Sequence, residues 1–85
     1  MILRKSAPTD ETDYPPPRKR SLTLRGHRTS VSLEDPFWRE FCRLAAAEGV
    51  SVNALASRID DARGTGTTLA SAMRLHVLAM LLAGR

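Results

Sequence analysis

The sequence contains a single cysteine, Cys42, in 85 residues. One thiol excludes an intrachain disulfide and a multi-cysteine metal site, and it fits a reducing cytoplasm better than secretion. A chain this short buries only a marginal core, so we expect oligomerisation to supply the missing stability. The longest apolar run, LHVLAMLLAG, is about half as long as a membrane span. The start MILRKS lacks the apolar stretch of a signal peptide, and we expect a cytoplasmic protein with no membrane partner.

Catalytic and cofactor signatures are also missing. The sequence shows no nucleophile paired with a base and no glycine-rich phosphate loop, so we expect no enzymatic activity and no cofactor. The adjacent Asp60 and Asp61 point about 100° apart on a helix. Solvation or pairing with a nearby arginine, Arg58 or Arg63, is the better interpretation of these carboxylates. Neither histidine has a metal-binding neighbour in the sequence: we expect His27 to lie in a turn or an arm and His76 to be a packed or interface residue of the third helix. Cys42 is expected to be a thiol of the core.

Positive charge is concentrated near the N-terminus, although the whole chain carries only +4. Residues 1–30 hold seven lysines and arginines against three acidic residues, whereas residues 31–85 hold six of each kind. The basic segment RKRSLTLRGHR, Arg18 to Arg28, is suited to attract a polyanion. A solvated, solubilising arm would have the same composition.

Two alternating segments follow a polar tail. Residues 1–20 form a basic, proline-rich tail that is predicted to be disordered, because it has too few large apolar groups to offset the entropy of ordering. In the next stretch, SLTLRGHRTSVSL, apolar and polar residues alternate, with Leu22 and Leu24 at even positions and Val31 and Leu33 at odd positions. A single straight strand would place the two pairs on opposite faces, so it cannot bury all four residues on one face.

Two structures satisfy this pattern. In the first, the chain forms a hairpin with a type II′ turn at Gly26-His27, and residues 21–27 supply its first strand. Leu22 then faces Val31 across the two strands, and Leu24 faces Thr29. In the second, residues 21–27 remain an arm, and only Arg28 to Leu33 forms a strand, which pairs with another chain. The sequence does not separate the two structures, and we favour the second.

Two helices joined by a tight turn are predicted next. The first opens at EDPFW, where Asp35 caps the free amides and Pro36 suits the first turn, and it ends at Gly49 as a left-handed cap. Its core face consists of apolar residues at helical spacing, with two more beside them: Phe37, Phe41, Leu44 and Ala45, then Trp38 and Cys42. Ser51 caps the second helix, whose core residues are Val52, Leu55, Ala56 and Ile59.

A third helix is predicted within residues 65–85, after the break ARGTGTT, with Thr67 or Thr68 as its cap. It carries two apolar stripes, one of Leu69, Met73, Val77 and Met80 and the other of Leu75, Leu78 and Leu82. A helix that is apolar on most of its circumference must be buried on several sides. In so short a chain this again calls for a second subunit.

The order of strand, helix, tight turn and helix over Arg28 to Ile59 resembles the ribbon-helix-helix family of DNA-binding proteins, the Arc and methionine-repressor type. EGVSVNAL, Glu48 to Leu55, is similar to the family's G-x-[ST]-x-[NS] turn into the second helix. The stretch from RGHRTSVSLEDPFW through LASAMR is similar to a bacterial subgroup with an added third helix. The resemblance implies a mainly α fold with one short β-strand, a core over residues 28–64, and an intertwined homodimer with an intersubunit antiparallel β-ribbon.

Strand geometry places Thr29, Val31 and Leu33 on one face, which must cover the helices, and the polar residues between them on the other. The resemblance implies that these polar residues contact bases in the major groove: Arg28, Ser30 and Ser32. A solvated sheet face is the alternative interpretation. The resemblance implies phosphate contacts at the start of the second helix, and the charge cluster adds a basic arm: Ser51, Val52 and Asn53, then Arg18, Lys19, Arg20 and Arg25. The expected dimer core comprises Val31, Leu33, Phe37, Trp38, Phe41, Leu55 and Ile59.

The expected function is therefore transcriptional repression by a homodimer that binds double-stranded DNA sequence-specifically, associated with the nucleoid in the cytoplasm. Two other functions remain open: a protein-interaction module whose third helix binds another protein, and an antitoxin that also neutralises a toxin. A hairpin over residues 21–33 would weigh against the repressor. Two such hairpins joined in a dimer make four strands, which are too wide for a groove of about 12 Å.

Overall fold

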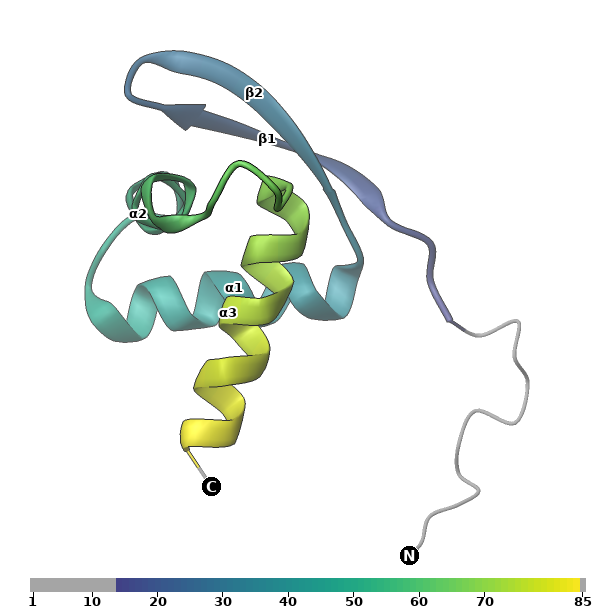
Figure 1. The fold of residues 1–85 in the computed structure, drawn as a ribbon. Coiled ribbons are helices and arrows are strands. Elements are labelled where there is room, and N and C mark those ends of the chain that lie inside the picture. The colour runs from purple at the N-terminus through teal and green to yellow at the C-terminus, as the bar shows by residue number, and fades with distance from the viewer. Residues whose placement is uncertain (1–13, 85) are drawn as a thin grey trace, which may run out of the picture.

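The computed structural model describes residues 14–84, so residues 1–13 of the expected tail lie outside the described part. Two strands come first, β1 (Arg18–Leu24) and β2 (His27–Leu33). Three helices follow, α1 (Asp35–Glu48), α2 (Val52–Ala62) and α3 (Leu69–Ala83). The strands form an antiparallel hairpin that lies over one side of the helices, with β1 in contact with α2 and β2 in contact with α3 (Figure 1). A mainly α fold with a β-ribbon ahead of the helices is as predicted.

The hairpin settles the alternative that the sequence left open. The favoured structure, in which β2 finds a partner only in another chain, is wrong for one edge of β2, because β1 of the same chain lies there. The tail also ends earlier than expected, since residues 18–20 belong to β1. Arg20 explains this difference, because its side chain is only 13 % exposed and holds the strand against the start of α1.

The turn of the hairpin lies one residue earlier than predicted. Arg25 and Gly26 both have positive φ, 51° and 82°, as the two central residues of a type I′ turn require. The register therefore pairs Leu22 with Thr29, and Leu24 with His27, rather than the predicted partners. Moving the turn by one residue shifts the pairing by two, so every side chain stays on its expected face. The four apolar residues of the hairpin all face the helices and are buried: Leu22, Leu24, Val31 and Leu33.

Local signals set the ends of the helices. The residue preceding α1 is Glu34, and neither it nor Asp35 caps the helix as predicted, because the Asp35 carboxylate pairs instead with Arg18 and Arg20. Gly49 ends α1 at φ 74°, as expected. Ser51 accepts a hydrogen bond from the Ala54 amide at 3.0 Å and begins α2. Thr68, of the two threonines considered, caps α3 by accepting from the Ser71 amide at 3.1 Å.

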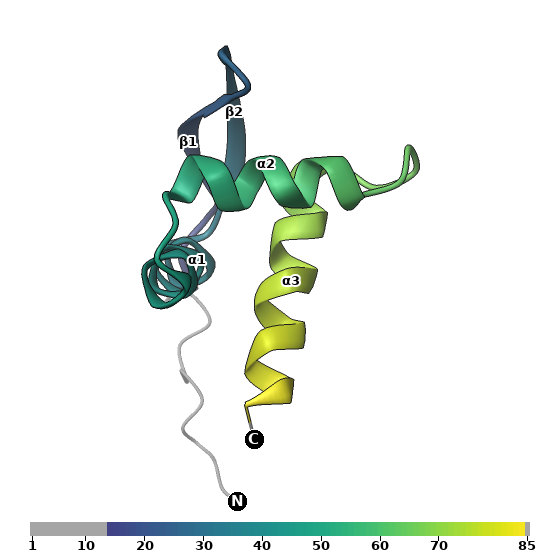
Figure 2. The same cartoon turned by 90° about the vertical axis from the view of Figure 1, so that its left-hand side faces the viewer.

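The core forms where the hairpin, α1, α2 and α3 meet. Five of the residues expected in a dimer core are buried within this single chain: Val31, Leu33, Phe41, Leu55 and Ile59. Phe37 and Trp38 pack against the same core and are half-buried. Figure 2 shows α3 running away from the hairpin, in a direction that crosses that of α2. Only one side of α3, centred on Met73 and Val77, is buried.

Candidate nucleic-acid interface

The outward face of the hairpin is entirely polar. It consists of the alternate residues of both strands, all of them exposed, and we call it the outer face: Lys19, Ser21, Thr23, Arg28, Ser30 and Ser32. The three predicted base contacts lie together on this face, as expected from strand alternation. Sequence reasoning left their β1 neighbours off this face, because it favoured an arm over residues 21–27 and extended the tail through residue 20. The alternation of residues in RKRSLTL predicts a strand, and it places Lys19, Ser21 and Thr23 on one face of that strand.

Cross-strand pairing gives the outer face its chemistry. Lys19 lies opposite Ser32, Ser21 opposite Ser30, and Thr23 opposite Arg28. Arg28 donates a hydrogen bond from Nη2 to the Ser21 hydroxyl oxygen at 3.2 Å, which holds the guanidinium over the face. The face therefore presents two cations and four hydroxyls, with no acidic or apolar side chain among them.

The other basic residues near the hairpin make contacts within the fold. Arg20 donates from Nε and Nη2 to the Leu33 carbonyl oxygen, at 3.3 and 3.2 Å, and pairs with Asp35. Its guanidinium carbon lies 5.4 Å from the centre of the Trp38 ring, within the range of a cation–π contact. Arg20 was expected to contact phosphate, but these contacts turn it toward the protein. Sequence reasoning missed this role because no local pattern links it to Trp38.

Arg25 has a similar role at the tip of the hairpin. It pairs with Asp60 at 3.7 Å and with Asp61, and its Nη2 donates to the Ser57 carbonyl oxygen at 3.3 Å. The Arg63 side chain also donates to Asp60, at 2.8 Å, as one of the predicted pairings required. The hydrogen bond from Arg63 is the largest cause of the lowered pKa of Asp60, with Arg25 adding to it. Asp60 and Asp61 thus hold Arg25, and with it the hairpin tip, against α2, which is a structural role.

The start of α2 lies beside the β1 edge of the hairpin. Asn53 accepts a hydrogen bond at Oδ1 from the Thr23 amide at 3.0 Å, which joins the helix to the strand. Ser51 satisfies the Ala54 amide, whereas helix geometry leaves the amides of Val52 and Asn53 without an intrahelical partner. The partial positive charge of the helix start makes these two amides suitable for phosphate. The predicted phosphate site therefore lies beside Thr23, whose partner across the hairpin is the predicted base contact Arg28.

On the other edge of the hairpin, Arg74 of α3 closes the end of β2. It donates to the Ser32 carbonyl oxygen at 3.3 Å, pairs with Glu34 at 2.9 Å and lies 5.8 Å from the centre of the Phe37 ring. The hydrogen bond from Arg74 lowers the pKa of Glu34, and the hydrogen bond from Arg20 lowers the pKa of Asp35. Two arginines on opposite sides of the hairpin thus fix it to the start of α1.

These carboxylates predict a dependence of stability on pH. A carboxyl whose pKa is lower in the folded state stabilises the fold fully above its unfolded pKa, about 4, and the contribution disappears as the pH falls through the folded value. We expect Asp35→Asn to lower the melting temperature slightly at neutral pH, because the pair with Arg20 is partly exposed. On acid titration of both proteins, the difference in melting temperature should shrink below about pH 4. A difference that stays constant down to about pH 2 would contradict this role of Asp35.

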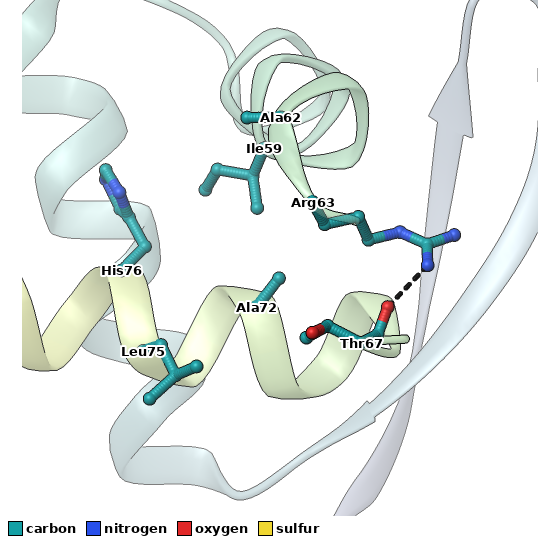
Figure 3. Close-up of a pocket in the computed structure, with 7 residues that line it drawn as sticks. All are labelled: Ile59, Ala62, Arg63, Thr67, Ala72, Leu75 and His76. Carbon is teal, nitrogen blue, oxygen red and sulfur yellow. Dashed lines mark hydrogen bonds between the residues drawn. The ribbon is translucent and has the colours of Figure 1, made fainter. Parts of the chain in front are cut away.

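A groove of about 360 Å³ lies between α2 and α3 (Figure 3). Its walls are largely apolar and include Ile59, Ala62, Ala72 and Leu75. Arg63 closes one end by donating from Nη1 to the Thr67 carbonyl oxygen at 2.6 Å, drawn as a dashed line in Figure 3.

Cys42 and His76, which were expected to be packed side chains, are both partly buried. Cys42 is half-buried, and burial raises the pKa of its thiol, which disfavours the reactive thiolate. His76 packs edge-on to Phe41, with ring centres 6.4 Å apart. Within residues 14–84, no three histidine, cysteine, aspartate or glutamate residues group together in a way that could hold a metal ion. No helix in this part of the chain is both long enough and apolar enough to span a membrane.

Comparison with known proteins agrees with this geometry. A family model described as a ribbon-helix-helix domain matches residues 17–81, which include the hairpin and nearly all of the three helices. No curated protein and no solved structure gives a significant match. Proteins of the matched family typically bind DNA or act in regulation, and they typically dimerise. Because the match covers well over half of the sequence, the chain belongs to the ribbon-helix-helix domain family.

Proposed function

We propose that this protein binds double-stranded DNA sequence-specifically as a homodimer and represses transcription. The observation that carries the proposal is the outer face, where two paired strands present only cations and hydroxyls. A two-stranded ribbon is one of the two elements that the major groove admits, the groove being about 12 Å wide. Paired strands lie about 4.8 Å apart, so one hairpin with its side chains fits this width.

Arg28 is the main base contact in this proposal. Its forked donors match the O6 and N7 acceptors of guanine, the commonest specific contact in the major groove. Ser30 and Ser32 lie on the same strand and face, and their hydroxyls both donate and accept, so each discriminates only weakly between bases. We therefore expect bridging waters or DNA shape to supply part of the specificity.

Phosphate contacts come from the edges of the outer face. Lys19 lies at the open end of β1, where its exposed ammonium group suits the DNA backbone. The free amides of Val52 and Asn53 lie beside the same strand, next to Thr23. Such contacts hold a protein in register on the duplex without reading its sequence. Arg20 and Arg25 are left out of this surface because both guanidinium groups pair with carboxylates of the protein.

The intrachain hairpin changes how a dimer would meet DNA. If two copies joined at their β2 edges, the result would be a sheet of four strands. At about 4.8 Å between strands, such a sheet with its side chains exceeds the width of the groove. We therefore propose that each hairpin enters the groove by itself and that the dimer places two hairpins on one DNA molecule.

Selection from fragmented genomic DNA tests the proposal. The purified protein is mixed with the fragments at physiological salt, and the bound fragments are recovered and sequenced. Short sites in inverted or tandem pairs are expected, because a dimer carries two reading surfaces. Even recovery across the genome that fades as salt is raised would reduce DNA to a nonspecific partner, since nonspecific binding rests on phosphate contacts alone.

A second candidate function is a protein-interaction module, including an antitoxin-like protein that binds a toxin. The exposed leucines of α3 favour it, because soluble domains rarely leave such residues grouped in water. In that case Arg28→Ala combined with Ser30→Ala would leave the activity in the cell unchanged. A repressor would lose its preference among DNA sequences.

A further inference from the structure

The Arg28 side chain is held from the neighbouring strand of its own hairpin. Its Nη2 donates to the Ser21 hydroxyl oxygen at 3.2 Å, and both side chains are exposed on the outer face. Thr23 is the residue directly opposite Arg28. Ser21 comes two residues earlier on β1, so the hydrogen bond runs diagonally across the strands, over about 7–8 Å between backbones, which a long side chain can span. Arg28 therefore leans along the outer face toward β1.

The contact fixes the guanidinium without neutralising it. Within residues 14–84 this is the only side-chain hydrogen bond of Arg28, and no carboxylate pairs with it. Arg20 and Arg25, by contrast, are both paired with carboxylates of the protein. A guanidinium carries several N–H donors in one plane, and the hydroxyl of Ser21 occupies only one of them. The remaining donors and the full positive charge stay available to a ligand.

A fixed guanidinium favours base recognition more than general attraction to DNA. An exposed arginine loses side-chain freedom when it binds guanine, and this entropic cost arises only at the right base pair, because at a wrong one the side chain stays mobile. A hydroxyl that already orients the side chain in the free protein reduces that cost. In the groove, a donor that does not reach guanine also loses water and needs another acceptor, which Ser21 supplies.

We propose that Ser21 of β1 is a positioning residue that orients Arg28 for base recognition, so that both strands of one hairpin determine the sequence preference. The inference rests on the proposed function and assigns β1 a part in specificity that Arg28 and its β2 neighbours do not provide. Ser21 acts through Arg28 rather than through a base contact of its own. Its effect is therefore confined to the base pair that Arg28 contacts.

Ser21→Ala in the full chain tests the proposal. Affinity is measured for a recovered site and for the same site with single base pairs exchanged, and Arg28→Ala identifies the base pair that Arg28 contacts. At that base pair the preference of Ser21→Ala should fall about 2- to 10-fold below the wild type, the range for one side chain that becomes mobile. Ser21→Thr keeps the hydroxyl and should restore the preference.

Thr29→Val is the matched control, because it removes an exposed hydroxyl from the residue next to Arg28, on the other face of the hairpin. It should keep the wild-type preference. Each of these variants should also keep the helical circular-dichroism signal, because all of the changed side chains are exposed. A loss of preference in Ser21→Ala that Ser21→Thr does not restore would contradict the role of the hydroxyl.

A double variant separates positioning from direct contact. When Arg28 is already alanine, adding Ser21→Ala should change nothing further at that base pair, because the two effects share one interaction. A further loss there would mean that Ser21 contacts the base itself, and it overturns the inference. A wild-type preference that Ser21→Ala retains in full overturns the inference alone and leaves Arg28 as the base contact. A wild type without preference at any base pair overturns the proposed function, and this inference with it.

Discussion

Leu33→Asp is expected to unfold the domain. Leu33 is 0 % exposed and ends β2, where hairpin and helices meet. Arg20, which donates to the Leu33 carbonyl oxygen, already pairs with Asp35, and no fully buried residue of residues 14–84 is polar or charged, so a carboxylate at this position has no free cation to pair with. Burying an unpaired charge belongs to the changes that destabilise by more than about 4 kcal/mol, which approaches the whole stability of a small domain. The measurement is the circular-dichroism signal of the helices and its thermal transition.

The neighbouring Ser32→Asp is the matched control for this prediction. Its side chain lies on the outer face and is exposed, so the same charge meets water instead of the core. We expect Ser32→Asp to stay folded and to weaken DNA binding through repulsion of phosphate. A cooperative transition of Leu33→Asp at the wild-type temperature would contradict the buried position of Leu33.

Arg28→Ala is expected to remove most of the preference for one base pair. A bidentate contact to guanine contributes about 1–3 kcal/mol of discrimination against the wrong base. Affinity should be compared between a recovered site and the same site with single base pairs exchanged. The wild type should distinguish them at the position that Arg28 contacts, and the variant should bind both alike. Adding Ser30→Ala should flatten the neighbouring position further, by a smaller amount.

Lys19→Ala serves as the control on the same face. If Lys19 contacts phosphate, this variant should weaken binding about equally for all sequences and reduce the salt dependence by about one counterion. Discrimination between base pairs should remain. Full sequence preference in Arg28→Ala would contradict the assignment of Arg28, and the outer face would then be a solvated sheet surface.

The helices were predictable from sequence because their ends rest on local chemistry. Gly49 supplies the left-handed turn after α1, and Ser51 and Thr68 cap the amides of the next two helices. The exception is Asp35, which the local pattern marks as a cap. In the structure it pairs with arginines of β1, about fifteen residues earlier in the chain.

The hairpin was harder to predict because its turn depends on distant residues. A positive φ is unusual for arginine, and the local sequence favours Gly26 as the first central residue of the turn. Arg25 takes this conformation with its side chain held by Asp60 and Asp61, which no pattern near the turn indicates. The predicted register differs from the observed one by two residues. Because side chains alternate between faces with a period of two, the polar and apolar residues of the hairpin were still predicted on the correct faces.

The intrachain hairpin also bears on how the protein folds. In an intertwined dimer each strand can pair only with a strand of another chain, so folding and association are one concentration-dependent reaction. Here β2 pairs with a strand only two residues away along the chain, a contact that closes within microseconds. The chain can therefore complete its core alone, at a rate independent of its concentration, and a freshly made copy need not meet a second one before its core residues are buried.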